Sequence, residues 1–156
     1  MVIGFFALVI LGIYLASNNA LPKIPSFASI NATSTIAVTA PNGTINVEIA
    51  DTDDLRARGL SYRESLASDG GMLFVFQISG IYGFWMKDMN FPLDMVWVDA
   101  NHKVVAIDSD IATSTYPDSI FPPSDISYVI ELNAGAARQF GIATGTVLMF
   151  DYKSGH

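Results

Sequence analysis

Residues 70–99 read GGMLFVFQISGIYGFWMKDMNFPLDMVWVD, and this stretch decides the fold. In the predicted strands, apolar residues (Met, Phe, Trp, Val and Leu) stand at both odd and even positions. Apolar side chains therefore point to both sides of each strand, which indicates burial on both faces. Lys87, Asp88 and Asp94 stand inside the apolar run. An ionised side chain in such a place needs a partner or a solvent-filled groove. The stretch therefore predicts core strands with a candidate site among them.

The segments on either side extend this pattern of short strands. Residues 35–40 and 44–50 alternate around the turn sequence Pro41-Asn42-Gly43, which predicts a hairpin. Further strands are expected at 72–76, 82–87, 94–100, 103–108, 127–132 and 146–152. Helices are expected at 51–60, after a capping box at 61–64, and at 134–140 with Asn133 as the cap.

The predicted fold class is mainly β. Many short strands with two or three short helices favour an antiparallel β-sandwich or a partly open barrel. An N-terminal apolar helix is expected to precede this domain, because residues 1–16 carry no charge.

Three regions are expected along the chain. Residues 1–21 are long enough to cross a bilayer, and we expect a transmembrane anchor, with a cleaved signal peptide as the alternative. Residues 22–35, rich in Pro, Ser and Asn, are expected to be a tether. Residues 36–153 are expected to form one globular β domain. The charge of Lys23 alone would place this domain inside the cell.

Composition excludes several kinds of site. The chain has no Cys, and its formal net charge of −7 opposes nucleic-acid binding. His102 lies in a predicted turn and His156 is the last residue, so a Ser-His-Asp arrangement and a zinc site lack their usual parts. The Met residues are interleaved with Phe and Trp, which favours core packing over copper binding. We therefore expect no metal and no cofactor.

Five sequence blocks carry a resemblance to a known family. They are RGLSYR (58–63), GMLFVF (71–76), FWMKDM (84–89), PLDM (92–95) and ELNAG (131–135), followed by Gly141 and Gly145. In this order they resemble the bacterial and archaeal family catalogued as domain of unknown function 192, over about residues 45–151. The resemblance implies a mostly β fold that stands behind an N-terminal signal or anchor and faces outside the cytoplasm. This implied location outweighs the single positive charge of Lys23. The resemblance implies no established activity.

The carboxylates near the strands have two interpretations. Asp88, Asp94 and Glu131 are candidates for an acid and base pair, as in glycan hydrolysis. The favoured interpretation is structural: each accepts from Arg58, Arg63 or Lys87, or from backbone amides.

A candidate ligand site combines Trp85, Lys87, Asp88 and Asp94, which lie within ten residues of one another. We expect Trp85 to be buried, in which case these residues are core and a paired ion. If Trp85 is exposed, an aromatic floor with a polar rim suits a sugar or a peptide.

Three functions follow from these observations. The first is a membrane-tethered extracytoplasmic module, without catalysis, that binds a glycan, a peptide or an envelope protein. The second is a carboxylate-based hydrolase of envelope glycan, and the third is a structural accessory of an envelope complex. A shallow aromatic groove would favour the first, two unpaired carboxyls the second, and a flat apolar patch the third.

Overall fold

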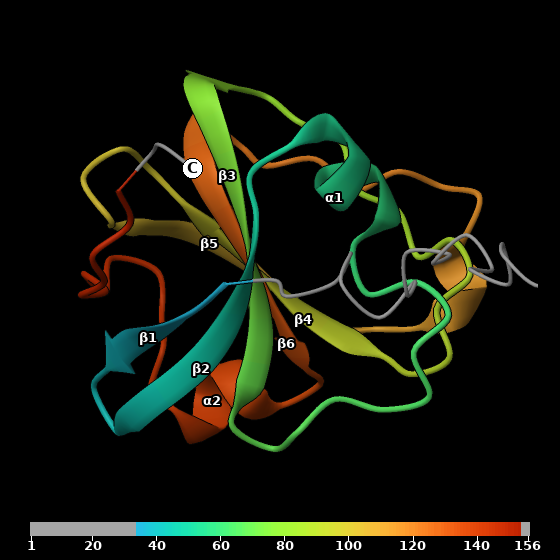
Figure 1. The fold of residues 1–156 in the computed structure, drawn as a ribbon, viewed down its shortest axis with the longest axis horizontal. Coiled ribbons are helices and arrows are strands. Elements are labelled where there is room, and N and C mark those ends of the chain that lie inside the picture. Colours follow the sequence, from blue (N-terminus) through green and yellow to red (C-terminus); the bar gives the residue numbers. More distant parts are fainter. Residues whose placement is uncertain (1–33, 154–156) are drawn as a thin grey trace, which may run out of the picture. The chain divides into compact units, whose positions relative to one another are not determined.

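A computed structural model describes residues 34–153, which form a mainly β domain (Figure 1). Its strands are β1 (Thr35–Ala40), β2 (Gly43–Ala50), β3 (Gly70–Gly80), β4 (Leu93–Val98), β5 (Val104–Ile111) and β6 (Ile126–Asn133). Two short helices, α1 (Asp53–Arg58) and α2 (Ala136–Gln139), and the 3-10 turn η2 (Thr113–Thr115) complete the elements.

One mixed sheet holds all six strands, in the order β1-β2-β3-β6-β4-β5. Strands β2 and β3 are parallel, and the other neighbours are antiparallel. The mainly β expectation is confirmed, whereas a wholly antiparallel arrangement is wrong at this one pair. The cause is the crossover of residues 51–69, which contains α1 and returns the chain to the starting end of β2.

The sheet is buried on both faces, as the alternation along its central strands requires. In β3, Leu73 and Val75 face one apolar cluster, while Met72 and Phe74 face the other. Strands β4 and β6 alternate in the same way. The face that α2 covers is called the α2 face, and the opposite face, next to α1, is called the pocket face.

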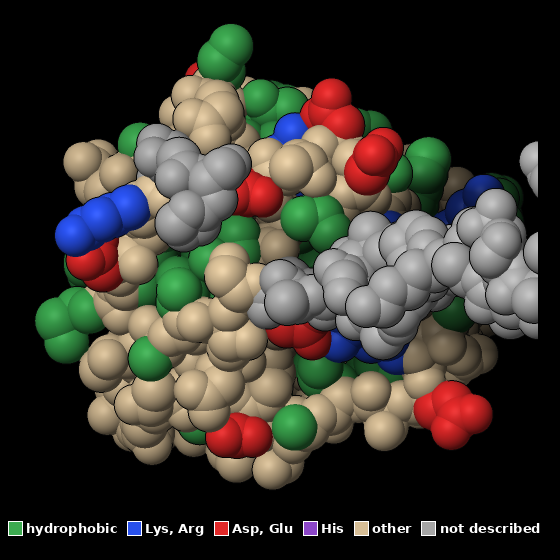
Figure 2. All heavy atoms as spheres, viewed as in Figure 1, with side chains coloured by type: hydrophobic (Ala, Val, Ile, Leu, Met, Phe, Trp, Pro, Cys, Tyr) green, Lys and Arg blue, Asp and Glu red, His purple; other side chains and the backbone are tan. Residues whose placement is uncertain are grey.

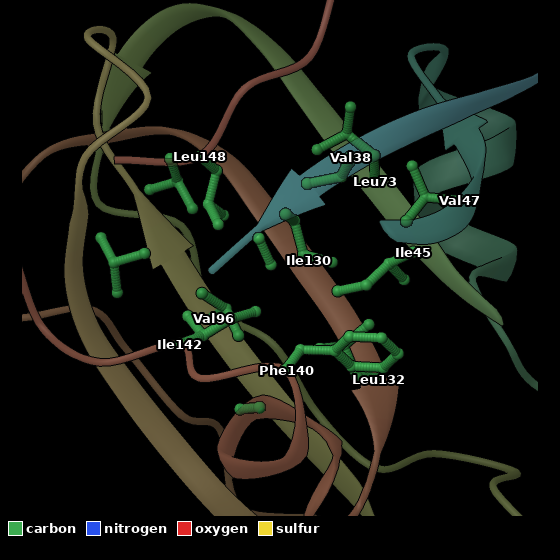
Figure 3. Close-up of a cluster of buried hydrophobic side chains, with 14 of the residues drawn as sticks. Val38, Ile45, Val47, Leu73, Val96, Ile130, Leu132, Phe140, Ile142 and Leu148 are labelled. Atoms are coloured by element: carbon green, nitrogen blue, oxygen red, sulfur yellow. The ribbon is translucent and has the colours of Figure 1, made fainter. Parts of the chain in front are cut away.

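The α2 face carries the larger apolar cluster. Figure 3 shows side chains from β1, β2, β3, β4 and β6 pointing toward one another and toward Phe140, Ile142 and Leu148. The pocket face packs Phe74, Met95 and Trp97 against residues of the segment between β3 and β4. Both clusters are fully desolvated at their centres, and this burial is the main stabilising contribution to the fold.

Two expected strands form only isolated bridges instead. Residues 82–87 contribute only the pair Phe84 and Ile120. Residues 146–152 contribute the pairs Thr39 with Met149 and Lys103 with Val147. This last segment therefore contacts edge strand β1 on one side and, on the other, the residue just before edge strand β5.

The helix boundaries follow local capping with two corrections. Thr52 caps α1 by accepting from the Leu55 amide at 3.2 Å. Asn133 does not cap α2, because its Nδ2 donates to the carbonyl oxygens of Leu66 and Ala67. No helix opens at Ser61, whose hydroxyl donates to the Lys87 carbonyl instead.

The expected anchor at 1–21, and all of the expected tether at 22–35 except its last two residues, lie outside the described residues. Among residues 34–153, neither helix is long and apolar enough to cross a membrane.

Candidate functional site

A pocket of about 250 Å³ opens on the pocket face of the sheet. Helix α1, the turn that follows it, β3, β6 and the segment 82–89 line it. We call it the Glu131 pocket after the carboxyl that β6 contributes. Two groups of side chains, one aromatic and one charged, define its chemistry.

Glu131 is buried in the sheet, with 5% of its surface exposed. Its register neighbours are Met72 on β3 and Met95 on β4, which offer no hydrogen-bond donor. Desolvation raises the pKa of this carboxyl from 4.5 to about 8. At neutral pH the group is therefore a protonated carboxylic acid, able to donate as well as accept.

The Glu131 carboxyl has no hydrogen-bond partner among residues 34–153. In the same part of the chain, no fully enclosed side-chain oxygen or nitrogen lacks a partner. The Glu131 oxygens therefore open into the pocket that this residue lines. A buried polar group aimed into a pocket is the kind of group that a ligand satisfies.

Aromatic rings form the walls of the Glu131 pocket. The five that line it are Phe74, Phe76, Tyr82, Phe84 and Trp85. The rings of Phe76 and Tyr82 stack at 3.8 Å between centroids, and Phe84 meets Phe74 edge-on at 5.0 Å. These mutual contacts hold Phe74, Phe76, Tyr82 and Phe84 in fixed orientations, so most of the wall is preformed.

Arg56 joins α1 to the sheet at the edge of the pocket. Its guanidinium donates to the carbonyls of Asp51 and Val75, each at 2.7 Å, and to the Asp53 carboxylate at 2.5 Å. It also lies over the Phe76 ring, 5.4 Å from the centroid. These bonds fix the position of α1 against β3 and neutralise the Arg56 charge locally.

The turn after α1 needs a glycine. Gly59 has φ 50° and ψ −135°, and a Cβ there would lie 3.2 Å from the tip of the Phe74 ring. Without a side chain, the helix end approaches the aromatic wall closely. Arg58 and Ser61, on either side of this turn, also line the pocket.

Trp85 is 54% exposed, so the expectation of its burial is wrong. It lies in an irregular segment and not on a strand of the sheet. Trp85 lines the Glu131 pocket, whereas the exposed Lys87 and Asp88 do not. Asp88 has φ 56° and accepts from the Tyr62 hydroxyl at 2.7 Å, which raises the pKa of Tyr62.

Asp94 lies on the other face of the sheet and is not brought together with Trp85. It is fully buried, and it pairs in register with Leu132 of the α2 face. Its two oxygens accept from the amides of Asp110 and Ala137, both at 2.9 Å. Of the interpretations offered above, acceptance from backbone amides is the one that the structure bears out for Asp94.

The predicted arginine pairs are corrected at Arg63. Its guanidinium binds the Glu48 carboxylate with both nitrogens, and not Asp88, Asp94 or Glu131. Arg63 lies within the crossover of residues 51–69, and this crossover places it beside Glu48 of β2. Arg58 lines the Glu131 pocket, and its predicted pairing stays a prediction.

The distribution of charged side chains bears on metal and nucleic-acid binding. Residues 34–153 hold no group of three or more His, Asp or Glu side chains that could bind a metal ion. On the visible part of the face in Figure 2, acidic side chains are scattered and the Lys and Arg side chains form no continuous patch.

Sequence reasoning missed Arg56, Phe76 and Tyr82 as site residues. The sequence did indicate the aromatic pair, since Phe76 and Tyr82 lie on either side of the end of a strand and stack on each other once the chain turns. Glu131 was singled out, but as one half of an ion pair or of an acid and base pair. Its apolar neighbours in the sheet come from strands far away in sequence, so its isolation was not visible.

The fold and the pocket define a mainly β domain with an aromatic pocket and a buried acid. A family model matches residues 36–150, and the chain belongs to that family, DUF192, described as an uncharacterised ACR. The expected family is thus confirmed.

Two solved structures are similar to this chain. One is a protein of Sinorhizobium meliloti described as a candidate transcription regulator; it is 29% identical with a TM-score of 0.68, and the match covers 74% of this chain and 92% of that one. The other is a protein of unknown function from Novosphingobium aromaticivorans, 27% identical with a TM-score of 0.64, covering 74% and 83%. No curated protein matches this chain.

Proposed function

We propose that this chain is a binding module that takes a small organic molecule in the Glu131 pocket. The observation that carries the proposal is the buried, unpartnered carboxyl of Glu131 facing a preformed aromatic pocket. Aromatic walls give a ligand apolar contact area, and one polar group fixes its orientation. The pocket volume, about 250 Å³, suits a small molecule better than a folded partner.

Binding is favoured over glycan hydrolysis because the candidate carboxyls Asp88, Asp94 and Glu131 do not meet in one site. Hydrolysis needs two carboxyls facing each other across the substrate. Asp53, the other carboxylate that lines the pocket, is 98% exposed and bound to Arg56. Asp94 faces the α2 side, and Asp88 is held by Tyr62.

We also propose that the module is tethered to a membrane and faces outside the cytoplasm. This rests on the uncharged apolar residues 1–16 and on the location that the family resemblance implies. The regulator description of the Sinorhizobium meliloti relative is not carried over, because a net charge of −7 opposes contact with phosphates.

The test is a screen of small aromatic and aliphatic fragments by saturation-transfer NMR, on the full chain in a mild non-ionic detergent. Ala57 is exposed on α1 and lines the pocket, so Ala57→Trp should fill the pocket mouth with little effect on stability. The matched control is Met149→Ala, which changes an exposed apolar side chain that is not a lining residue.

Fragment signals should weaken at least about tenfold in Ala57→Trp and persist in Met149→Ala. Signals that survive in Ala57→Trp would place the binding elsewhere and refute the proposal. The same conclusion would follow if no fragment binds the unaltered chain.

A further inference from the structure

We infer that the Glu131 pocket binds an organic cation: an ammonium group on an apolar body, with the Glu131 carboxylate as its counter-ion. This inference rests on the proposed function and names the ligand class of the same pocket.

The first support is the isolation of Glu131. The buried carboxyl lies between two Met side chains, and the described chain supplies neither a cation nor a hydrogen-bond donor to it. An anionic ligand would meet a like charge if Glu131 ionised, and a neutral ligand would leave the carboxyl protonated. Only a cation supplies the charge that a buried carboxylate lacks.

The second support is the character of the walls. Aromatic faces carry partial negative charge and attract an ammonium group, most strongly in a desolvated site. Five rings line this one pocket, from Phe74 at its buried end to the half-exposed Trp85. The same walls would also hold the apolar body of the ligand.

The rim charges set the orientation of the ligand. Asp53, Arg56 and Arg58 line the pocket together with Tyr82 and Glu131. The Arg56 charge is compensated by Asp53 and by two backbone carbonyls. The Glu131 carboxylate attracts the ammonium group, so that group belongs at the buried Glu131 end and the apolar body belongs toward the half-exposed Trp85.

Binding of this kind moves one proton. Desolvation raises the Glu131 pKa to about 8, so the empty pocket holds a carboxylic acid at pH 7. When an ammonium ion enters, the O–H bond of Glu131 breaks, the proton leaves to buffer, and carboxylate and ammonium pair. Net proton release is therefore a signature that a neutral ligand does not give.

The experiment is isothermal titration calorimetry on the full chain at pH 7, in two buffers of different ionisation enthalpy. The probes are benzylammonium, benzyl alcohol and benzoate, which share a ring and differ in charge. Benzylammonium should bind at least about tenfold more tightly than the other two and release about one proton per ligand.

The variants separate the role of charge from that of shape. Glu131→Gln should remove the preference for benzylammonium and the proton release, while weak binding of benzyl alcohol persists. The control Glu64→Gln, at an exposed position that does not line the pocket, should change neither.

Equal or tighter binding of benzyl alcohol or benzoate, abolished by Ala57→Trp, would overturn the cation inference and leave the proposed function standing. Tight benzylammonium binding that Glu131→Gln leaves unchanged would also overturn it. If none of the three probes binds, and no fragment binds in the screen above, both proposals fall.

Discussion

Burial of Glu131 makes the stability of this domain depend on pH, and Glu131→Gln should remove that dependence. The carboxyl pKa is 4.5 in the unfolded chain and about 8 in the folded one. Between these values the folded state binds more protons than the unfolded state, so stability falls as pH rises. Below pH 4.5 the penalty is absent, and above about pH 8 it is complete.

The magnitude follows from the two pKa values. Each pKa unit corresponds to about 1.4 kcal/mol, so the full penalty is on the order of 5 kcal/mol, and about 3 kcal/mol of it is present at pH 7. Gln has nearly the same shape as a protonated Glu and cannot ionise. The variant should therefore match the unaltered chain near pH 4.5 and exceed its stability progressively up to pH 8.5.

Urea unfolding followed by tryptophan fluorescence measures this, because Trp97 is fully buried in the folded domain. The control is Glu64→Gln, an exposed carboxyl outside the pocket, whose stability profile should parallel that of the unaltered chain. Parallel profiles for Glu131→Gln and the unaltered chain from pH 5 to 8.5 would refute the argument. Glu131 would then be solvated, and the buried-acid basis of the pocket would be lost.

Three other outcomes test the structure. Asp94→Ala leaves the buried Ala137 amide and the part-buried Asp110 amide without an acceptor and should cost about 3 kcal/mol of unfolding free energy in urea, whereas the exposed Asp118→Ala should change it by under about 0.5 kcal/mol. Gly71→Ala should cost about 2 kcal/mol in the same assay, because its Cβ would lie 2.8 Å from the Leu132 side chain; an unchanged midpoint would contradict this packing. Deleting residues 1–30 should leave a soluble domain with a cooperative thermal transition and a β signature by circular dichroism, and aggregation of the shortened chain would count against the tether.

The strands that alternate around a turn were predictable from sequence. The hairpin of β1 and β2 follows from two β-branched runs around Pro41-Asn42-Gly43, and it forms with Thr39 opposite Thr44. The pairing of β4 with β5 was predictable for the same reason, because the two strands are close in sequence. What sequence did not reveal was the parallel pairing of β2 and β3, because the crossover that allows it is set by packing of α1 and not by any local turn signal.

The site was predicted only in part, for a similar reason. Trp85 and Glu131 were named as candidates, and both line one pocket. Other lining residues, such as Phe74 on β3 and Arg56 on α1, come from segments 11 to 75 residues away. Asp94 and Glu131 resemble each other in sequence context, yet they point to opposite faces. Asp94 accepts hydrogen bonds from two backbone amides, whereas Glu131 has no hydrogen-bond partner in the described chain.

Residues 145–149 form backbone hydrogen bonds with both edges of the sheet. They bond to Thr39 in edge strand β1, and to His102 and Val104 at the start of edge strand β5. A ribosome makes this segment after both of the strands it joins. Until it emerges, the nascent domain carries two unsatisfied β-edges, and such edges invite pairing with neighbouring chains. Residues 145–149, which follow all six strands in the chain, are thus the ones that end the exposure of these two edges to aggregation.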